Sequence, residues 1–421
     1  MITTEIQTAH IPSIYKRFTD IIGDKHWKDR VALLKQEIKG NRFLADYNQS
    51  ENSIAFQLEY LRELTAKFGN IPSGEINNPD IFPAVRFAAQ VLSIMDISTK
   101  EFAEQLKRRI HGALKNPNDM RGLCLELNVA THFVRRNLNI SWPEMTGIGT
   151  FDLFIEELGP KGLEIECKSI STDKGRKVHG REVLEFYNLL WPHLEAIKKG
   201  LHTGLSVVLT VPERLPSKYE SRKTLAKQVI KQIICGQSVT LSDGSNLKIT
   251  EFDVNRLGYI QKISNPKKIR AAFDEVTETQ NREVMVVGTK AGGALALVVQ
   301  SAKDDKPMKA IFDTLSNSAK KQLSGTRGGM FLAELHGIDG EQLISIASQD
   351  KDPTQQQTLL QLGSNEFLST TDREHVIGVG FLSKSDFMPA QNGIVNSGGI
   401  SYIFLNRKSS LWSDDFNGLF S

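Results

Sequence analysis

GTFDLFIEELGPKGLEIECKS, residues 149–169, contains two short strand-like runs joined by a turn that carries Gly159, Pro160 and Gly162. In the second run, apolar and charged residues alternate over Leu163, Glu164, Ile165, Glu166, Cys167 and Lys168. Successive side chains of a strand point to opposite faces of a sheet, so two carboxylates and one amine are expected on the same face. The stretch therefore predicts a β-hairpin with a charged face.

The first run of the hairpin carries an acid where an apolar residue would be expected. Asp152 stands among Phe151, Leu153 and Phe154 in a stretch that is otherwise apolar. A buried carboxylate without a partner is costly. Pairing of the two runs can bring Asp152 close to Glu166, and two neighbouring carboxylates are stabilised by a cation or a shared proton. We therefore expect a hard divalent ion, Mg2+ or Mn2+, at these two acids.

Lys168 follows Glu166 by two residues on the charged face. Its amine can orient or deprotonate an attacking water and can stabilise charge on an attacked phosphate. Asp152, a gap and then Glu166-Cys167-Lys168 resemble the motif of the PD-(D/E)xK nuclease superfamily. The resemblance implies metal-dependent hydrolysis of phosphodiester bonds, with Asp152 and Glu166 as metal ligands and Asp152, Glu166 and Lys168 as catalytic residues.

The resemblance extends over about residues 120 to 212. The core of this family runs helix, strand, strand with the Asp, strand with ExK, helix and strand, and the sequence can be read in the same order. In this reading, residues 182–199 form the second helix and residues 204–211 form the last strand. The chain departs from the family motif before the acid, where Thr150-Phe151 stands in place of the proline.

Two alternatives stay open for the hairpin and its function. As a structure, it is either this site or an ordinary half-exposed ribbon with Glu164, Glu166 and Lys168 as its solvated face. The acid inside the first run and the order of the flanking elements favour the site. As a function, the alternative to a nuclease is a nucleic-acid-binding or scaffold subunit that keeps the nuclease-like fold without hydrolysis.

The helix expected at residues 120–138 carries a further acid on its apolar face. At 100° per residue, Glu126 lies between Ala130 and Phe133. An acid that faces the core needs a partner. Many nucleases with this fold supply an additional metal ligand from this helix, so by resemblance Glu126 is the third candidate ligand. The alternative is a carboxylate at the edge of the stripe that pairs with an arginine.

A basic loop follows the hairpin and is the candidate nucleic-acid-binding segment. Its cations are Lys174, Arg176, Lys177 and Arg181, and they are opposed by a single acid, Asp173. Such a loop can contact phosphates, although a solvated loop with incidental charge is the alternative. A helix at residues 217–235 is a second basic candidate, with Lys218, Arg222, Lys223, Lys227 and Lys231.

The composition of the chain excludes several other classes of protein. The 421 residues are 40% hydrophobic and 24% charged, with a net charge of +3, as in ordinary globular proteins. The three cysteines are far apart and form no CxxC, which argues against a disulfide framework or a zinc site. No apolar run approaches the ~18 residues that span a bilayer. We therefore expect a cytoplasmic protein without a membrane partner.

The sequence predicts a mixed α/β protein of three regions. Residues 1–115 form an N-terminal helical bundle, residues 116–260 a restriction-endonuclease-like α/β core, and residues 261–421 a further α/β region. The third region is either a degenerate repeat of the core or an extension of the same sheet. DNA is the expected partner, with RNA as the alternative. A protein partner at the N-terminal helices and a homo-oligomer stay open.

Overall fold

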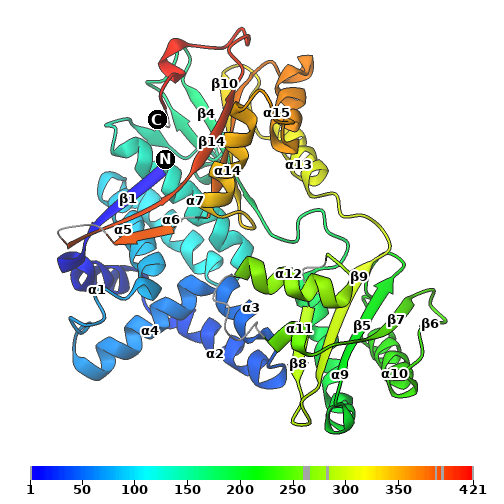
Figure 1. Cartoon of the computed structure of the whole chain (residues 1–421). Helices are drawn as coiled ribbons and strands as arrows, with labels where there is room; N and C mark the ends of the chain where they lie inside the picture. The colour runs from blue at the N-terminus through cyan, green and yellow to red at the C-terminus, as the bar shows by residue number, and fades with distance from the viewer. Residues whose placement is uncertain (1, 259–265, 281–283, 385, 390–392, 420–421) are drawn as a thin grey trace. The chain divides into compact units, whose positions relative to one another are not determined.

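The computed structural model describes residues 2–258, 266–280, 284–384, 386–389 and 393–419 (Figure 1). The chain divides into two compact units. Unit 1 comprises residues 1–35, 49–174 and 307–421, and unit 2 comprises residues 36–48 and 175–306. Most of unit 2 is therefore an insertion between two halves of unit 1. The predicted mixed α/β class is confirmed.

Unit 1 begins with β1 (Ile2–Gln7), so the first residues are a strand and not part of a purely helical region. The helices that follow are α1 (Ile11–Ile22), α2 (Lys25–Gly40), α3 (Leu44–Glu51), α4 (Ser53–Phe68), α5 (Phe82–Ile97), α6 (Lys100–Ala113), α7 (Pro117–Val134) and α8 (Pro143–Thr146). Residues 36–48, at the end of α2 and the start of α3, are assigned to unit 2. After the insertion, unit 1 continues with α13 (Pro307–Lys321), α14 (Gly340–Lys351) and α15 (Leu359–Ser369).

The main sheet of unit 1 has the strand order β14-β11-β10-β4-β3-β2. Its strands are β2 (Ile140–Ser141), β3 (Leu153–Ile155), β4 (Leu163–Ile170), β10 (Gly328–Leu335), β11 (Val376–Ser383) and β14 (Ser401–Leu405). Strands β4, β10 and β11 are parallel, whereas β2, β3 and β14 are paired antiparallel to their neighbours. A smaller sheet is formed by β1, β13 (Ile394–Gly399) and β12 (Asp386–Pro389).

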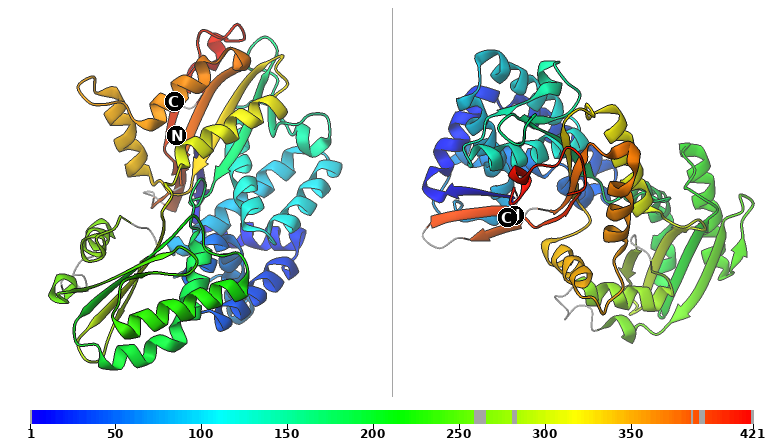
Figure 2. Two further views of the ribbon diagram at one scale, coloured as in Figure 1. Left: turned by 90° about the vertical axis from the view of Figure 1, so that its right-hand side faces the viewer. Right: turned by 90° about the horizontal axis from the view of Figure 1, so that it is seen from above.

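Helices cover both faces of the main sheet (Figures 1 and 2). Leu163, Ile165 and Cys167 of β4 pack in one core with α7. Ile170 of the same strand packs in a second core with α13 and α15. The alternation of β4 therefore directs its two faces to two helical layers, and both faces are buried.

Unit 2 is built around a second sheet, with the order β6-β7-β5-β9-β8. Its elements are α9 (Gly180–Gly200), β5 (Gly204–Val211), α10 (Tyr219–Cys235), β6 (Val239–Thr240), β7 (Asn246–Phe252), α11 (Asn255–Gly258), α12 (Pro266–Thr277), β8 (Val284–Gly288) and β9 (Ala294–Ser301). The apolar faces of α9 and α10 share one core with β5 and β9, and α12 packs in another with Ala294. The two ends of the insertion are joined, because the Lys306 N–H donates a 2.9 Å hydrogen bond to the Gly175 carbonyl.

The prediction that residues 182–199 and 204–211 complete the core of the hairpin is wrong. These residues form α9 and β5, and β5 pairs with β7 and β9 in unit 2. The parallel neighbour of β4 is β10, which follows α13. The order helix, strand, strand, strand, helix, strand is therefore made by α7, β2, β3, β4, α13 and β10.

The expected region boundaries differ from the two units in the same way. The boundary at 115/116 lies inside unit 1, and the boundary at 260/261 lies outside the described residues. Of the described residues after 261, those in β10, β11 and β14 extend the sheet of β4, as one of the two alternatives predicts, whereas β8 and β9 belong to the sheet of unit 2. Within the part of the chain that the structure describes, no helix has the length and apolar character needed to cross a bilayer.

Candidate functional site

Asp152 and Glu166 lie on adjacent strands of the main sheet. The antiparallel register of β3 and β4 places Leu153 beside Ile165, so Asp152, one residue earlier, lies opposite Glu166. The Asp152 carboxylate accepts a 2.7 Å hydrogen bond from the backbone N–H of Cys167. Both acids are buried. The structure thus places the two acids next to each other, as the hairpin predicts.

The alternative interpretation of a solvated ribbon is wrong. Glu164 and Glu166 are fully buried, although both are charged residues at alternate positions of β4. Glu164 accepts hydrogen bonds from the backbone N–H of Ser324, at 2.8 Å, and from its hydroxyl, at 2.5 Å. Glu164 therefore connects β4 to the segment after α13. Glu166 and Lys168 are the charged residues of this face that lie at the candidate site.

Lys168 is held between two side chains. Its ammonium group donates a short hydrogen bond to the Glu166 carboxylate and a 2.8 Å hydrogen bond to the side-chain oxygen of Gln322. Gln322 lies just after α13, 154 positions further along the chain. The sequence contains no signal for this contact, because it depends on the return of the chain after the insertion.

Glu126 reaches the site from α7 and pairs with a residue of α6. An Arg109 guanidinium nitrogen lies 2.5 Å from one Glu126 carboxylate oxygen, and the other oxygen is buried without a hydrogen-bond partner. The predicted burial of Glu126 is confirmed. The arginine partner supports the alternative interpretation of an ion pair. The unpartnered oxygen supports the interpretation as a metal ligand, as does the contribution of Glu126 to the raised pKa of Asp152.

Arg109 is a site residue that the sequence analysis did not identify. It follows Phe102 by seven residues, so on a helix the two side chains lie about 20° apart on the same face. That face is the apolar face of α6, where Leu106 and Ile110 are buried. A cation at this position is a signal that could have predicted a buried ion pair.

Burial raises the pKa of each of the three acids. The pKa of Glu166 rises to about 7 because the side chain is removed from water, although Lys168 opposes the shift. The pKa of Asp152 is raised well above its ordinary value by burial, then by the neighbouring Glu126 and Glu166. Burial also raises the pKa of Glu126, against the effect of Arg109. To stay ionised while buried, these three carboxylates need more positive charge than Lys168 and Arg109 supply.

The donor set of the site suits a hard divalent cation. One oxygen of Glu126 and one of Glu166 are buried without a partner, and carboxylate oxygens are preferred ligands of Mg2+ and Mn2+. Asp152 and Glu166 would hold such an ion, with Glu126 as the further ligand. In the described ranges, however, no group of three or more His, Cys, Asp or Glu side chains is gathered as closely as a metal centre requires. The residues therefore fit a cation in chemistry, but their side chains are not arranged around one.

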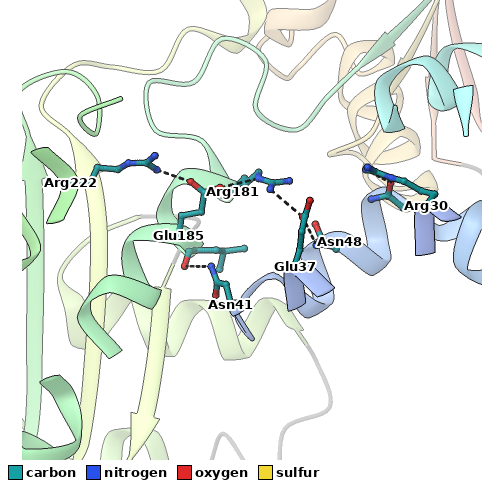
Figure 3. Close-up of polar contacts among 9 residues, drawn as sticks. Arg30, Glu37, Asn41, Asn48, Arg181, Glu185 and Arg222 are labelled. Carbon is teal, nitrogen blue, oxygen red and sulfur yellow. Dashed lines mark hydrogen bonds and ion pairs between the residues drawn. The ribbon is translucent and has the colours of Figure 1, made fainter. Parts of the chain in front are cut away.

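The four cations of the expected basic loop are found at the entry to unit 2. Lys174 is the last residue of this part of unit 1, and Arg176 pairs with Asp305. Lys177 pairs with Glu213. Arg181 lies between Glu37 and Glu185, and Arg222 contacts Glu185 from α10 (Figure 3). Three of the four expected nucleic-acid-binding residues thus already have acidic partners.

Comparison of the chain with protein-family models, with curated proteins and with solved structures gives no match. The family resemblance therefore depends on the motif residues and on the order of elements around them. Any activity has to be argued from the site itself.

Proposed function

We propose that the chain is a metal-dependent nuclease that hydrolyses phosphodiester bonds in DNA. The observation that carries the proposal is the pair of buried carboxylates, Asp152 and Glu166, whose pKa values are raised and which lie beside the partly buried amine of Lys168. Strongly perturbed pKa values cluster at functional sites. A prokaryotic restriction or antiviral-defence role and a cytoplasmic location are part of the proposal, by resemblance.

The order of elements in unit 1 supports the proposal. The helix α7, the strands β2, β3 and β4, the helix α13 and the strand β10 follow each other as in the core of PD-(D/E)xK nucleases. Asp152 precedes β3, and Glu166 and Lys168 lie on β4, which are the places of the Asp and of ExK in that order. In this interpretation unit 2 is inserted between the ExK strand and the second core helix.

Each residue of the site has a defined chemical role in this proposal. When bound, Mg2+ or Mn2+ would supply positive charge that balances the acids and polarises the scissile phosphate. Asp152 and Glu166 would bind it, and the Cys167 N–H fixes the orientation of the Asp152 carboxylate. Gln322 holds the Lys168 amine at the site, where it would stabilise negative charge that develops on the phosphate.

The test combines metal binding with cleavage. We expect the purified chain to bind Mn2+ by calorimetry and to cleave DNA with Mg2+, on a panel of linear, circular and single-stranded DNA and RNA. Asp152→Asn and Glu166→Gln should each lose both properties. The control is Glu156→Gln, an exposed acid of the same hairpin, which should retain them. Full cleavage by the two site variants would refute the proposal.

A non-catalytic nucleic-acid-binding or scaffold subunit is the second candidate. The observation that favours it is that Lys168 and Arg109 already pair with Glu166 and Glu126, in the absence of a gathered ligand group among the described residues. This candidate predicts that the wild-type chain binds nucleic acid but neither binds Mn2+ nor cleaves any substrate of the panel.

A further inference from the structure

Charge is distributed unevenly between the two units. Unit 2 contains 23 Lys and Arg against 16 Asp and Glu, a net charge of +7. Unit 1 contains 29 Lys and Arg against 33 Asp and Glu, a net charge of −4. The small net charge of the whole chain therefore conceals a basic unit. An excess of positive charge on one unit favours association with a polyanion.

Helix α10 of unit 2 carries a row of exposed lysines. Lys223, Lys227 and Lys231, here called the α10 lysine stripe, recur every four residues and are all exposed. Successive members are separated by about 6 Å along the helix axis and lie on one side of it. The apolar side of α10, with Leu225 and Val229, is buried in the core of unit 2.

The stripe contrasts with those exposed lysines of the chain that pair with acids. Lys248, Lys309 and Lys320 each form an ion pair. Among the described residues, no ion pair joins a member of the stripe to an acid. The ammonium group of Lys223 lies 5.9 Å from the ring centroid of Tyr219, which is 56% exposed. Like charges repel along this row, and a partner with regularly spaced negative charges would relieve that repulsion.

We propose that the α10 lysine stripe is a nucleic-acid-binding surface that contacts the phosphates of one strand. The exposed ring of Tyr219 at the end of the stripe offers a face on which a base of a single strand can stack. Arg176, Lys177 and Arg181 contribute less, because each already pairs with an acid. That the bound nucleic acid is also the substrate rests on the proposed function, whereas binding itself does not.

An anionic membrane is a less suitable partner for the stripe. A helix that binds a bilayer surface inserts its apolar side between the lipids. The apolar side of α10 is packed in the core of unit 2 and is not available for insertion. A nucleic acid needs only the exposed cations and the aromatic ring.

The experiment compares charge variants of the full chain that also carry Asp152→Asn, in EDTA, so that cleavage does not interfere. Binding of labelled duplex and single-stranded DNA is measured by fluorescence anisotropy over a series of salt concentrations. Each phosphate contact contributes about 0.9 to the slope of log K against log salt for duplex DNA, so K223Q/K227Q/K231Q should lower this slope by about 2.7. At 0.1 M salt the same three contacts amount to a loss of affinity of up to about 500-fold.

Two variants control for net charge and for charge type. K248Q/K309Q/K320Q removes the same charge from lysines that are already paired and should bind nearly as the parent protein does. K223R/K227R/K231R should retain binding. The proposal would be overturned if K223Q/K227Q/K231Q and K248Q/K309Q/K320Q reduced DNA affinity equally. It would also be overturned if K223Q/K227Q/K231Q left the slope of log K against log salt unchanged. It would also be overturned if the stripe mattered only for binding to phosphatidylserine vesicles.

The outcomes also separate this proposal from the proposed function. If the wild-type chain cleaves no substrate but the stripe variant loses binding, the nuclease proposal fails and the binding surface stands. If the wild-type chain cleaves DNA and the stripe variant binds as before, the binding surface fails and the nuclease proposal stands.

Discussion

Glu166→Gln should change how the stability of the chain depends on pH. Glu166 is fully buried, and burial raises the pKa of its carboxyl from 4.5 to about 7. In the unfolded chain this carboxyl loses its proton near pH 4.5, whereas in the folded protein it keeps the proton until about pH 7. Between these values the unfolded state binds fewer protons, so the free energy of unfolding falls as the pH rises. The loss is complete above the pKa of the folded state.

The size of the effect follows from the two pKa values. Their difference corresponds to about 3 kcal/mol when the carboxyl is fully ionised. Between about pH 5 and about pH 8, wild-type protein should lose roughly 2–3 kcal/mol through Glu166. The glutamine variant cannot ionise and avoids this loss, while its side-chain oxygen can still accept the hydrogen bond from Lys168. The buried amide of the variant adds a cost that is the same at both pH values.

Urea unfolding in EDTA at these two pH values measures the difference. A Trp191→Phe background removes the tryptophan of unit 2, so that the fluorescence of Trp27, Trp142 and Trp412 reports on unit 1. Relative to wild type in this background, Glu166→Gln should become more stable by roughly 2–3 kcal/mol as the pH is raised from 5 to 8.

Glu164→Gln is the matched control for this prediction. Glu164 lies two residues away on the same strand and is equally buried, but it accepts two hydrogen bonds from Ser324. Its replacement should therefore lower stability and should not produce the gain at pH 8. The reasoning is refuted if the Glu166→Gln variant and wild type keep the same difference in free energy of unfolding at both pH values.

Three further predictions concern the basic residues and the cation. Lys168→Ala should lower the single-turnover cleavage rate by ~100-fold or more with little change in DNA affinity. The control, Lys161→Ala in the turn, should cleave at the wild-type rate. A wild-type rate for Lys168→Ala would show that the amine has no role in the chemical step. Mn2+ affinity, measured by calorimetry, should rise from about pH 6 to about pH 8 because the ion must displace the proton of Glu166, and a flat profile would contradict this. Arg109→Gln should lower the free energy of unfolding near pH 7 by about 1–3 kcal/mol because it leaves Glu126 buried without its partner. Glu126→Gln in the same chain should recover part of that loss, and the absence of recovery in this double-mutant cycle would show that the pair is not coupled.

The sequence by itself determined the local parts of the site. Alternation along residues 163–168 predicted a strand with its charged residues on one face, and these residues lie on β4. The acid within the first run predicted a buried Asp152 beside Glu166. The position of Glu126 on the apolar face of the helix expected at 120–138 predicted that this acid is buried, and it is. Such features are readable because the direction of a side chain in a strand or helix depends on positions a few residues apart.

Only the tertiary structure decided which elements complete the core. Residues 182–199 and 204–211 have the expected types and the expected order, but β5 pairs with β7 and β9, and β4 pairs with β10. The contact of Lys168 with Gln322 depends on the same choice. The cost of closing a loop grows only with the logarithm of its length, so a long insertion between two paired strands is tolerated almost as well as a short one. Nothing in the local sequence therefore distinguishes a strand that joins the first sheet from one that begins the second.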